Sequence, residues 1–302
     1  MEIDLSIDSL SVFEALASDT RLNIINKLSE KDRNIKELSH ELYMSSAIVS
    51  RHVKKLEGAG LIRTYALPAK SGVQKMCTLS VDHLSVVFPK QIYPKYNSNK
   101  YSIRLGHYFD YKVFPTCGLA TMDSIIGCSD DARYFMDSAR MNADIIWFSK
   151  GFVEYKFPNV LRKYQKPEVL EFSLEISSEF PGSNNNWPSD ITFYINDLEV
   201  GTWTVPGNYS DVRGKLTPLW WPDTNSQYGL LKTLRINSLQ TNMDGELISN
   251  ITINDLPFES DLITLRIAIK ENADNIGGLT IFGNTFGNHA QDIEYNLYYT
   301  EA

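Results

Sequence analysis

The hydrophobic periodicity of the chain changes once along its length, and this change limits the possible folds more than any other feature. Between residues 8 and 60, apolar residues recur every three to four positions, which is the spacing of amphipathic helices. Beyond residue 100 they alternate with polar residues, for example at Ile263, Leu265 and Ile267, which is the spacing of half-buried strands. The 302 residues are enough for two domains with separate cores. We therefore predict an α+β multidomain protein with a helical N-terminal part and a large antiparallel β part.

Composition and charge place the chain among ordinary globular proteins. Hydrophobic residues make up 43% and charged residues 22%, and no apolar run approaches the roughly 18 residues of a membrane-spanning helix. The start, MEIDLSIDSL, lacks the basic flank and apolar stretch of a signal peptide, so we expect a cytoplasmic protein without a membrane partner. The formal net charge is -8, yet residues 45–75 are strongly basic. Their basic residues, opposed only by Glu57, are Arg51, Lys54, Lys55, Arg63, Lys70 and Lys75.

Four helical patterns and a hairpin account for residues 8–80. The third helix is predicted to begin at Asn34, because Glu37 three residues later has the spacing of a reciprocal cap. After the fourth helix, residues 61–67 and 73–80 alternate like strands and are joined by a turn that contains proline and glycine. These two strands form a wing, with Lys70 at its tip and Lys75 just beyond.

The fourth helix is predicted to begin at Ser45 and to bury Val49, Val53 and Leu56. Its opposite face carries small residues near the N-terminus and basic residues further along, a combination that suits a DNA groove. The small residues allow close approach of the backbone, and the basic residues reach phosphates or guanine edges. The residues expected to contact DNA on this helix and the wing are Ser46, Ala47, Ser50, Arg51, Lys54, Lys55, Lys70 and Lys75.

Three runs in this part of the chain carry a family resemblance. They are ALASDTRL at residues 15–22, VSRHVKKL at residues 49–56 and AGLI at residues 59–62. Together they resemble the ArsR-type winged helix-turn-helix repressors, and the likeness spans about residues 9–82. The resemblance implies a homodimeric transcriptional regulator that places its fourth helix in the major groove of an operator. The wing would then lie along the minor groove or the DNA backbone.

The chain departs from this family in two places. The metal-sensing branch carries a Cys-x-Cys motif in its third helix, whereas residues 35–42 here read IKELSHEL, so we expect no metal ligand there. The family often has a long dimerisation helix after the wing, but Pro89 and Pro94 allow only a short one. Cys117 and Cys128 match no zinc spacing, and three cysteines without a CxxC pair indicate free thiols. We therefore predict no metal and no cofactor.

We predict a winged helix-turn-helix domain at residues 1–88, a linker at residues 89–100 and a β domain at residues 101–302. The linker holds two prolines and several polar residues. The β domain has many strands and no βαβ rhythm, which favours a β-sandwich resembling a jelly roll. Within it only residues 130–141 suggest a short helix, capped by Asp130 or Asp131.

A long connection at residues 205–229 is the most unusual segment of the predicted sandwich. It combines amides, carboxylates and tryptophans, and two other segments repeat the pairing of amides with an aromatic ring. Sugars are bound in this way, because a sugar face stacks on an aromatic ring while its hydroxyls need polar partners. The candidate ligand residues are Trp187, Arg213, Trp220, Trp221, Asp223, Asn225, Asn284, Asn288 and His289. The structural alternative is that Asn and Gly mark turns while the tryptophans fill the core.

These observations favour a DNA-binding repressor whose β-sandwich senses a small effector, a carbohydrate by its loop chemistry. In a second interpretation the sandwich serves only dimerisation or partner binding. A third is a sandwich enzyme with a DNA tether. We do not expect an enzyme and assign no catalytic residues, because no nucleophile-elbow, Walker or dinucleotide motif is present. Asp130 and Asp131 are better explained as a helix cap than as paired catalytic carboxylates.

Overall fold

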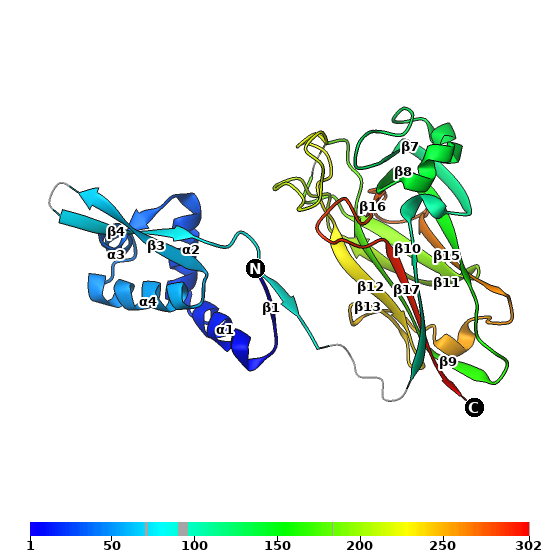
Figure 1. The fold of residues 1–302 in the computed structure, drawn as a ribbon, viewed down its shortest axis with the longest axis horizontal. Helices are drawn as coiled ribbons and strands as arrows, with labels where there is room; N and C mark the ends of the chain where they lie inside the picture. The colour runs from blue at the N-terminus through cyan, green and yellow to red at the C-terminus, as the bar shows by residue number, and fades with distance from the viewer. Residues whose placement is uncertain (70–71, 90–95, 183, 302) are drawn as a thin grey trace. The chain divides into compact units, whose positions relative to one another are not determined.

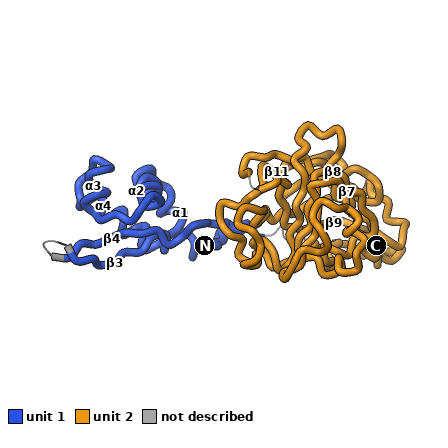
Figure 2. Tube along the Cα trace, turned by 90° about the horizontal axis from the view of Figure 1, so that it is seen from above, with its two compact units in different colours: residues 1–93 blue, residues 94–302 orange. Residues whose placement is uncertain are grey.

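A computed structural model describes residues 1–69, 72–89, 96–182 and 184–301. The chain divides into two compact units, residues 1–93 and residues 94–302 (Figure 2). Each unit has its own hydrophobic core, one drawn from residues 12–77 and the larger from residues 105–297. Within the described part of the chain, no helix is long and apolar enough to cross a membrane.

Unit 1 is built around four α-helices, each with one buried face. They are α1 (Leu10–Leu16), α2 (Asp19–Glu30), α3 (Ile35–Glu41) and α4 (Ser46–Gly58), and a 3-10 turn, η1 (Ile7–Ser9), precedes them. The predicted cap of the third helix is confirmed. The Asn34 side chain accepts from the Glu37 amide at 2.9 Å, and the Glu37 carboxylate accepts from the Asn34 amide at 2.7 Å.

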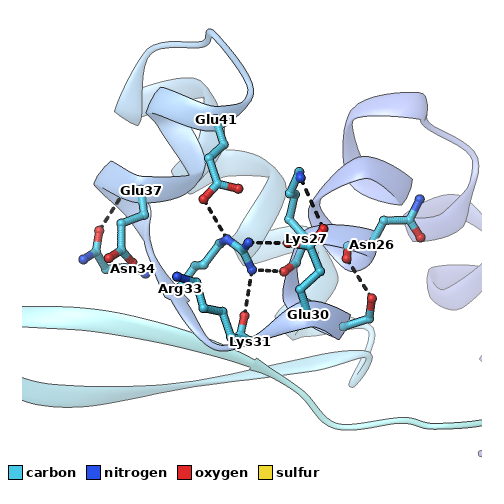
Figure 3. A network of polar contacts seen from close by, with 9 residues as sticks. Asn26, Lys27, Glu30, Lys31, Arg33, Asn34, Glu37 and Glu41 are labelled. Carbon is cyan, nitrogen blue, oxygen red and sulfur yellow. Dashed lines mark hydrogen bonds and ion pairs between the residues drawn. The ribbon is translucent and has the colours of Figure 1, made fainter.

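A buried arginine fastens α2 to α3 (Figure 3). Arg33 is 4% exposed, and its Nε donates to Glu41 at 2.8 Å while its Nη2 reaches Glu30 at 2.5 Å. The Nη1 atom donates to the backbone carbonyls of Lys27 and Lys31. The Arg33 guanidinium therefore donates to acceptors at the end of α2 and to the Glu41 carboxylate at the end of α3 at the same time.

The strands of unit 1 form two small sheets. The first has the order β2 (Arg33–Asn34), β4 (Gly72–Leu79) and β3 (Ile62–Ala69), so the predicted wing is confirmed as an antiparallel pair. The second pairs β1 (Glu2–Asp4) with β5 (Ser85–Val87) in parallel. The segment just after the wing is therefore a strand rather than the short helix that the proline spacing still allowed.

Unit 2 is an antiparallel β structure (Figure 1). Its strands are β6 (Asn97–Ile103), β7 (Asp110–Ala120), β8 (Ile145–Pro158), β9 (Gln165–Ser177), β10 (Ser189–Ile195), β11 (Leu198–Val205), β12 (Leu230–Ile236), β13 (Thr241–Met243), β14 (Glu246–Ser249), β15 (Leu262–Ile269), β16 (Leu279–Phe282) and β17 (Ile293–Glu301). Short 3-10 helices occur between them: η2 (Leu105–His107), η3 (Ala132–Met136), η4 (Ser138–Asn142) and η5 (Ile253–Asp255).

Hydrogen bonding joins these strands, among the described residues, into one 12-stranded sheet that folds over its own core. The order is β11-β10-β15-β8-β16-β9-β12-β13-β14, with β7 on β8, β17 on β9 and β6 on β17. The strand β16 pairs with both β8 and β9 and so links the two layers. At the far edges the layers approach again, where Ser249 Oγ donates to the Val200 carbonyl at 2.6 Å. The expected α+β architecture with a sandwich-like β part is thus confirmed.

Two local expectations for the β part need correction. Residues 97–100 were predicted to be linker but belong to β6, because they pair with residues 296–299 of β17. In place of the one helix predicted at residues 130–141, the chain has two 3-10 helices, η3 (Ala132–Met136) and η4 (Ser138–Asn142). Asp131 caps the first of these, whereas Asp130 accepts from the Cys117 amide at 2.9 Å.

Candidate functional site

The helix α4 is held by its buried face and by a local cap. Val49, Val53 and Leu56 are at most 1% exposed and pack into the core of unit 1. The Ser45 hydroxyl accepts from the Ile48 amide at 3.4 Å and so caps the first turn. The turn before it places Tyr43 at φ 53° with its side chain 96% exposed.

The outer face of α4 presents the predicted DNA-contacting residues to solvent. All six of them on this helix are exposed: Ser46, Ala47, Ser50, Arg51, Lys54 and Lys55. Lys55 pairs with Glu14 at 3.0 Å. Arg51 and Lys54 take part in no ion pair within the described part of unit 1, so their charges remain available to a polyanion.

On the wing, the predicted DNA-contacting lysine that the structure describes is engaged in an ion pair. Lys75 is exposed but pairs with Glu57 at 3.2 Å. The pKa of Glu57 is lowered mainly by a hydrogen bond from the Thr64 hydroxyl, and the contact with Lys75 lowers it further. Lys70 lies outside the described residues.

The surroundings of His52 on α4 favour its neutral form over its protonated form. Burial, with the neighbouring Arg21 and Arg51 charges, lowers the pKa of His52. Arg21 itself donates to the carbonyls of Ala15 at 2.5 Å and Glu14 at 2.7 Å, which ties α2 to the end of α1. The positive charge of this face near neutral pH therefore comes from arginine and lysine.

Unit 2 contains a cavity of about 180 Å³ that is lined by β7, β8 and β16 and by the loops that follow β7, β9 and β11. Its walls combine aromatic rings with hydroxyl, amide and carboxyl groups. The lining residues are Thr116, Ser129, Asp130, Ile145, Trp147, Glu179, Phe180, Pro181, Gly182, Trp221, Asn225, Ser226 and Thr280. Trp147 and Trp221 meet edge to face, with ring centroids 5.6 Å apart.

The polar side of this cavity is acidic. Glu179 accepts from the hydroxyls of Thr116 at 3.2 Å and Thr280 at 3.1 Å. Burial raises the pKa of Glu179 to about 7, and the nearby charge of Asp130 acts in the same direction. Asp130 is exposed and lies at the rim.

The loop between β11 and β12 supplies only part of this wall. Trp221 and Asn225 line the cavity, as the sugar hypothesis requires. Trp220 does not line it: its ring is 38% exposed and its Nε1 donates to the Met122 carbonyl at 2.6 Å. Arg213 and Asp223 form an ion pair with each other, and Arg213 also donates to the Pro218 carbonyl at 2.8 Å. That pair braces the loop.

The remaining predicted ligand residues lie away from the cavity wall. Trp187 packs edge to face on Phe180 at 4.8 Å, one ring behind the lining. Asn284 is exposed and does not line the cavity. The backbone amides of Asn288 and His289 donate to the buried Glu175 at 2.8 to 3.0 Å. This loop therefore encloses a carboxylate.

Sequence reasoning missed the residues that other segments bring to the cavity, chiefly Trp147, Glu179, Thr116 and Thr280. Trp147 sits in the apolar run IIWF at the start of β8, where a tryptophan looks like core. Glu179 and Thr116 are separated by 63 positions, and only sheet pairing joins them. One usable signal was Glu179 itself, a charged residue two positions after the end of β9.

The three cysteines are free thiols, with Cys77 and Cys117 buried and Cys128 exposed. Burial raises the pKa of Cys77 and of Cys117 to about 11. In the part of the chain that the structure covers, no group of three or more His, Cys, Asp or Glu side chains is arranged to hold a metal ion.

Comparison with known proteins identifies the helical part of unit 1. Residues 18–64 match the family described as bacterial regulatory protein, arsR family, so the chain carries an arsR-family helix-turn-helix domain there. A curated relative, the uncharacterized HTH-type transcriptional regulator MJ0229 of Methanocaldococcus jannaschii, is 38% identical over 58 residues. That match covers 19% of this chain and 61% of the relative. The chain thus spans less than two thirds of the length of this relative.

Several solved structures are similar to parts of this chain. HlyU from Vibrio cholerae is 27% identical and covers 24% of this chain and 76% of its own length, with a TM-score of 0.22. The CBM36-1 domain of a multidomain xylanase from the hindgut metagenome of Trinervitermes trinervoides is 12% identical, with a TM-score of 0.28. It covers 68% of this chain and 98% of its own length.

Proposed function

We propose that this protein is a DNA-binding transcriptional repressor of the ArsR type. The observation that carries the proposal is the outer face of α4, where Arg51 and Lys54 are exposed and without ion pairs among the described residues. A helix with small residues at its start and unpaired cations further along fits the major groove. The arsR-family match over residues 18–64 supports this assignment.

We further propose that unit 2 controls DNA binding through a small carbohydrate held in its cavity. The volume of about 180 Å³ is slightly more than the roughly 150 Å³ that accommodates a benzene ring in an engineered protein cavity, so one sugar ring is the right size. Trp147 and Trp221 offer apolar surface, and Asn225 and Glu179 offer partners for hydroxyls. The sugar must bind the DNA-competent and DNA-incompetent states differently to act as an effector.

The active form is proposed to be a homodimer that uses the surface around β1 and β5. Several apolar side chains on and beside these paired strands are exposed: Met1, Leu5, Ile7, Leu10, Val86, Val87 and Phe88. Contact with a second copy would remove part of this apolar surface from water. A symmetric dimer would also match two half-sites of an operator. Ile7→Glu should give monomers in light scattering at micromolar concentration, and a wild-type protein that is itself monomeric and binds DNA as one copy would contradict the dimer.

The DNA proposal is tested by selecting an operator from a random duplex library and measuring affinity by fluorescence anisotropy at two salt concentrations. Arg51→Ala should cost about 1 to 3 kcal/mol and relax sequence preference if Arg51 reads a base. Lys54→Ala should weaken binding to all sequences and reduce the salt dependence if Lys54 contacts phosphate. The matched control is Lys27→Ala, because Lys27 lies on α2 and pairs with Glu30. Wild-type affinity in both α4 variants would refute the proposed interface.

A further inference from the structure

The charged residues that line the cavity of unit 2, among those described, are all acidic. Two carboxyl groups, Glu179 and Asp130, belong to its lining, and no lysine, arginine or histidine is among the described residues that line it. Neither carboxylate takes part in a salt bridge with another described residue. An anionic ligand would therefore meet only repulsion there, whereas a cation would meet two unneutralised partners.

Glu179 is positioned to face a ligand rather than to stabilise the fold through an ion pair. Each of its carboxylate oxygens accepts one threonine hydroxyl, from Thr116 and Thr280, so lone pairs remain on both oxygens. Burial raises the pKa of Glu179 to about 7, because the ionised form is costly away from water. A bound cation would offset that cost.

The aromatic walls point to the same class of ligand. Trp147 is 9% exposed and Trp221 is 4% exposed, so each shows only a small apolar surface to the cavity. Aromatic rings attract cations as well as the C–H face of a sugar. The volume of about 180 Å³ admits one ring.

We propose that this cavity selects a monosaccharide that carries a positively charged amino group, with Glu179 and Asp130 supplying the counter-charges. This inference rests on the proposed carbohydrate control and narrows it to amino sugars. Neutral sugars should bind more weakly, and sugar acids or sugar phosphates should be rejected.

The test is calorimetric titration of the full chain with three pairs of ligands. Glucosamine, galactosamine and mannosamine are each compared with the parent hexose, and glucuronate serves as the anionic probe. At least one amino sugar should bind roughly tenfold or more tightly than its parent, the gain expected of a charge-assisted hydrogen bond. Glu179→Gln removes the charge and keeps one oxygen acceptor, while its amide nitrogen can donate to the other threonine hydroxyl, so the variant should abolish this preference. The matched control Glu246→Gln removes an exposed carboxylate outside the cavity lining and should leave the preference unchanged.

The possible results distinguish selection of amino sugars from the proposed control by a carbohydrate. If a neutral hexose binds as tightly as its amino derivative, or if Glu179→Gln keeps the preference, amino-sugar selection is wrong while carbohydrate control stands. If no sugar in the panel binds, both are overturned and only the DNA proposal remains. Choline is a cation without a sugar ring, and binding as tight as that of the amino sugars would overturn the sugar assignment. Thermal unfolding of each variant checks that the fold is intact.

Discussion

At the scale of single residues, Glu175 shows how a buried charge organises the end of the sandwich. Its carboxylate accepts from the backbone amides of Gly229 at 2.8 Å, Asn288 at 2.9 Å and His289 at 2.8 Å. Gly287 is required beside it, because a Cβ there would lie 2.4 Å from Glu175 Oε1. The Asn288 and His289 amides thereby hold the loop after β16 against β9, and the Gly229 amide holds the end of the loop between β11 and β12 there.

Glu175→Gln should therefore destabilise unit 2 even though the two side chains have the same shape. The amide group would turn N–H donors toward backbone N–H donors and leave buried groups unsatisfied, at a cost of about 2 to 4 kcal/mol. Urea unfolding followed by tryptophan fluorescence reports on this change, because all five tryptophans lie in unit 2. Glu246→Gln, at an exposed position, is the control. Equal unfolding midpoints for Glu175→Gln and the wild type would contradict the role given to Glu175.

The partly buried glutamate of the cavity, Glu179, predicts an unusual pH dependence of stability. Burial raises the pKa of Glu179 from an ordinary value of 4.5 to about 7. Between these values the folded protein binds more protons than the unfolded chain, so its stability is greatest at the acidic end and falls as pH rises. We expect the free energy of unfolding of unit 2 to decrease from about pH 5 to about pH 7.5. Denaturation across this range should show a smaller decrease for Glu179→Gln, and a wild-type stability that rises instead would refute the prediction.

At the scale of elements, the sequence predicted what local signals determine. The helix α4 follows from Ser45 and from the spacing of its buried residues, and α3 follows from Asn34 and Glu37. Alternation likewise located strands such as β15, which contains Ile263, Leu265 and Ile267. It could not give their partners, and the cavity depends on those partners, because β7, β8 and β16 are brought together only by long-range pairing. The sugar hypothesis therefore found Trp221 and Asn225 in one loop but not Trp147 and Glu179 in neighbouring strands and loops.

Arg33 provides a test of how the helices of unit 1 are joined. Arg33→Ala removes a shared donor from Glu41, from Glu30, which keeps Lys27, and from two carbonyl groups, so unit 1 should lose about 1 to 3 kcal/mol of stability. Helical circular dichroism during thermal unfolding measures the change. Arg63→Ala, an exposed wing position, controls for simple loss of charge. An unfolding midpoint no lower than that of the control would show that the network in Figure 3 adds little.

At the scale of the whole molecule, the two cores share no residue. One is formed by α1 to α4 with the wing strands, and the other by the strands of unit 2. Cooperative unfolding requires that loss of one part exposes the packing of the other. Separate cores therefore predict two unfolding transitions in calorimetry, one for each unit.

Ligands and variants should then act on these two transitions selectively. Operator DNA should raise the transition of unit 1, and a sugar held by Trp221 and Glu179 should raise that of unit 2, each in proportion to the logarithm of its concentration above Kd. Arg33→Ala should lower only the first transition and Glu175→Gln only the second. If both variants lower one shared transition, the units unfold as a single cooperative body. In that case the effector would control DNA binding by changing the stability of both units together. If each variant and ligand changes only its own transition, the effector must instead change how two independently stable units are arranged on the operator.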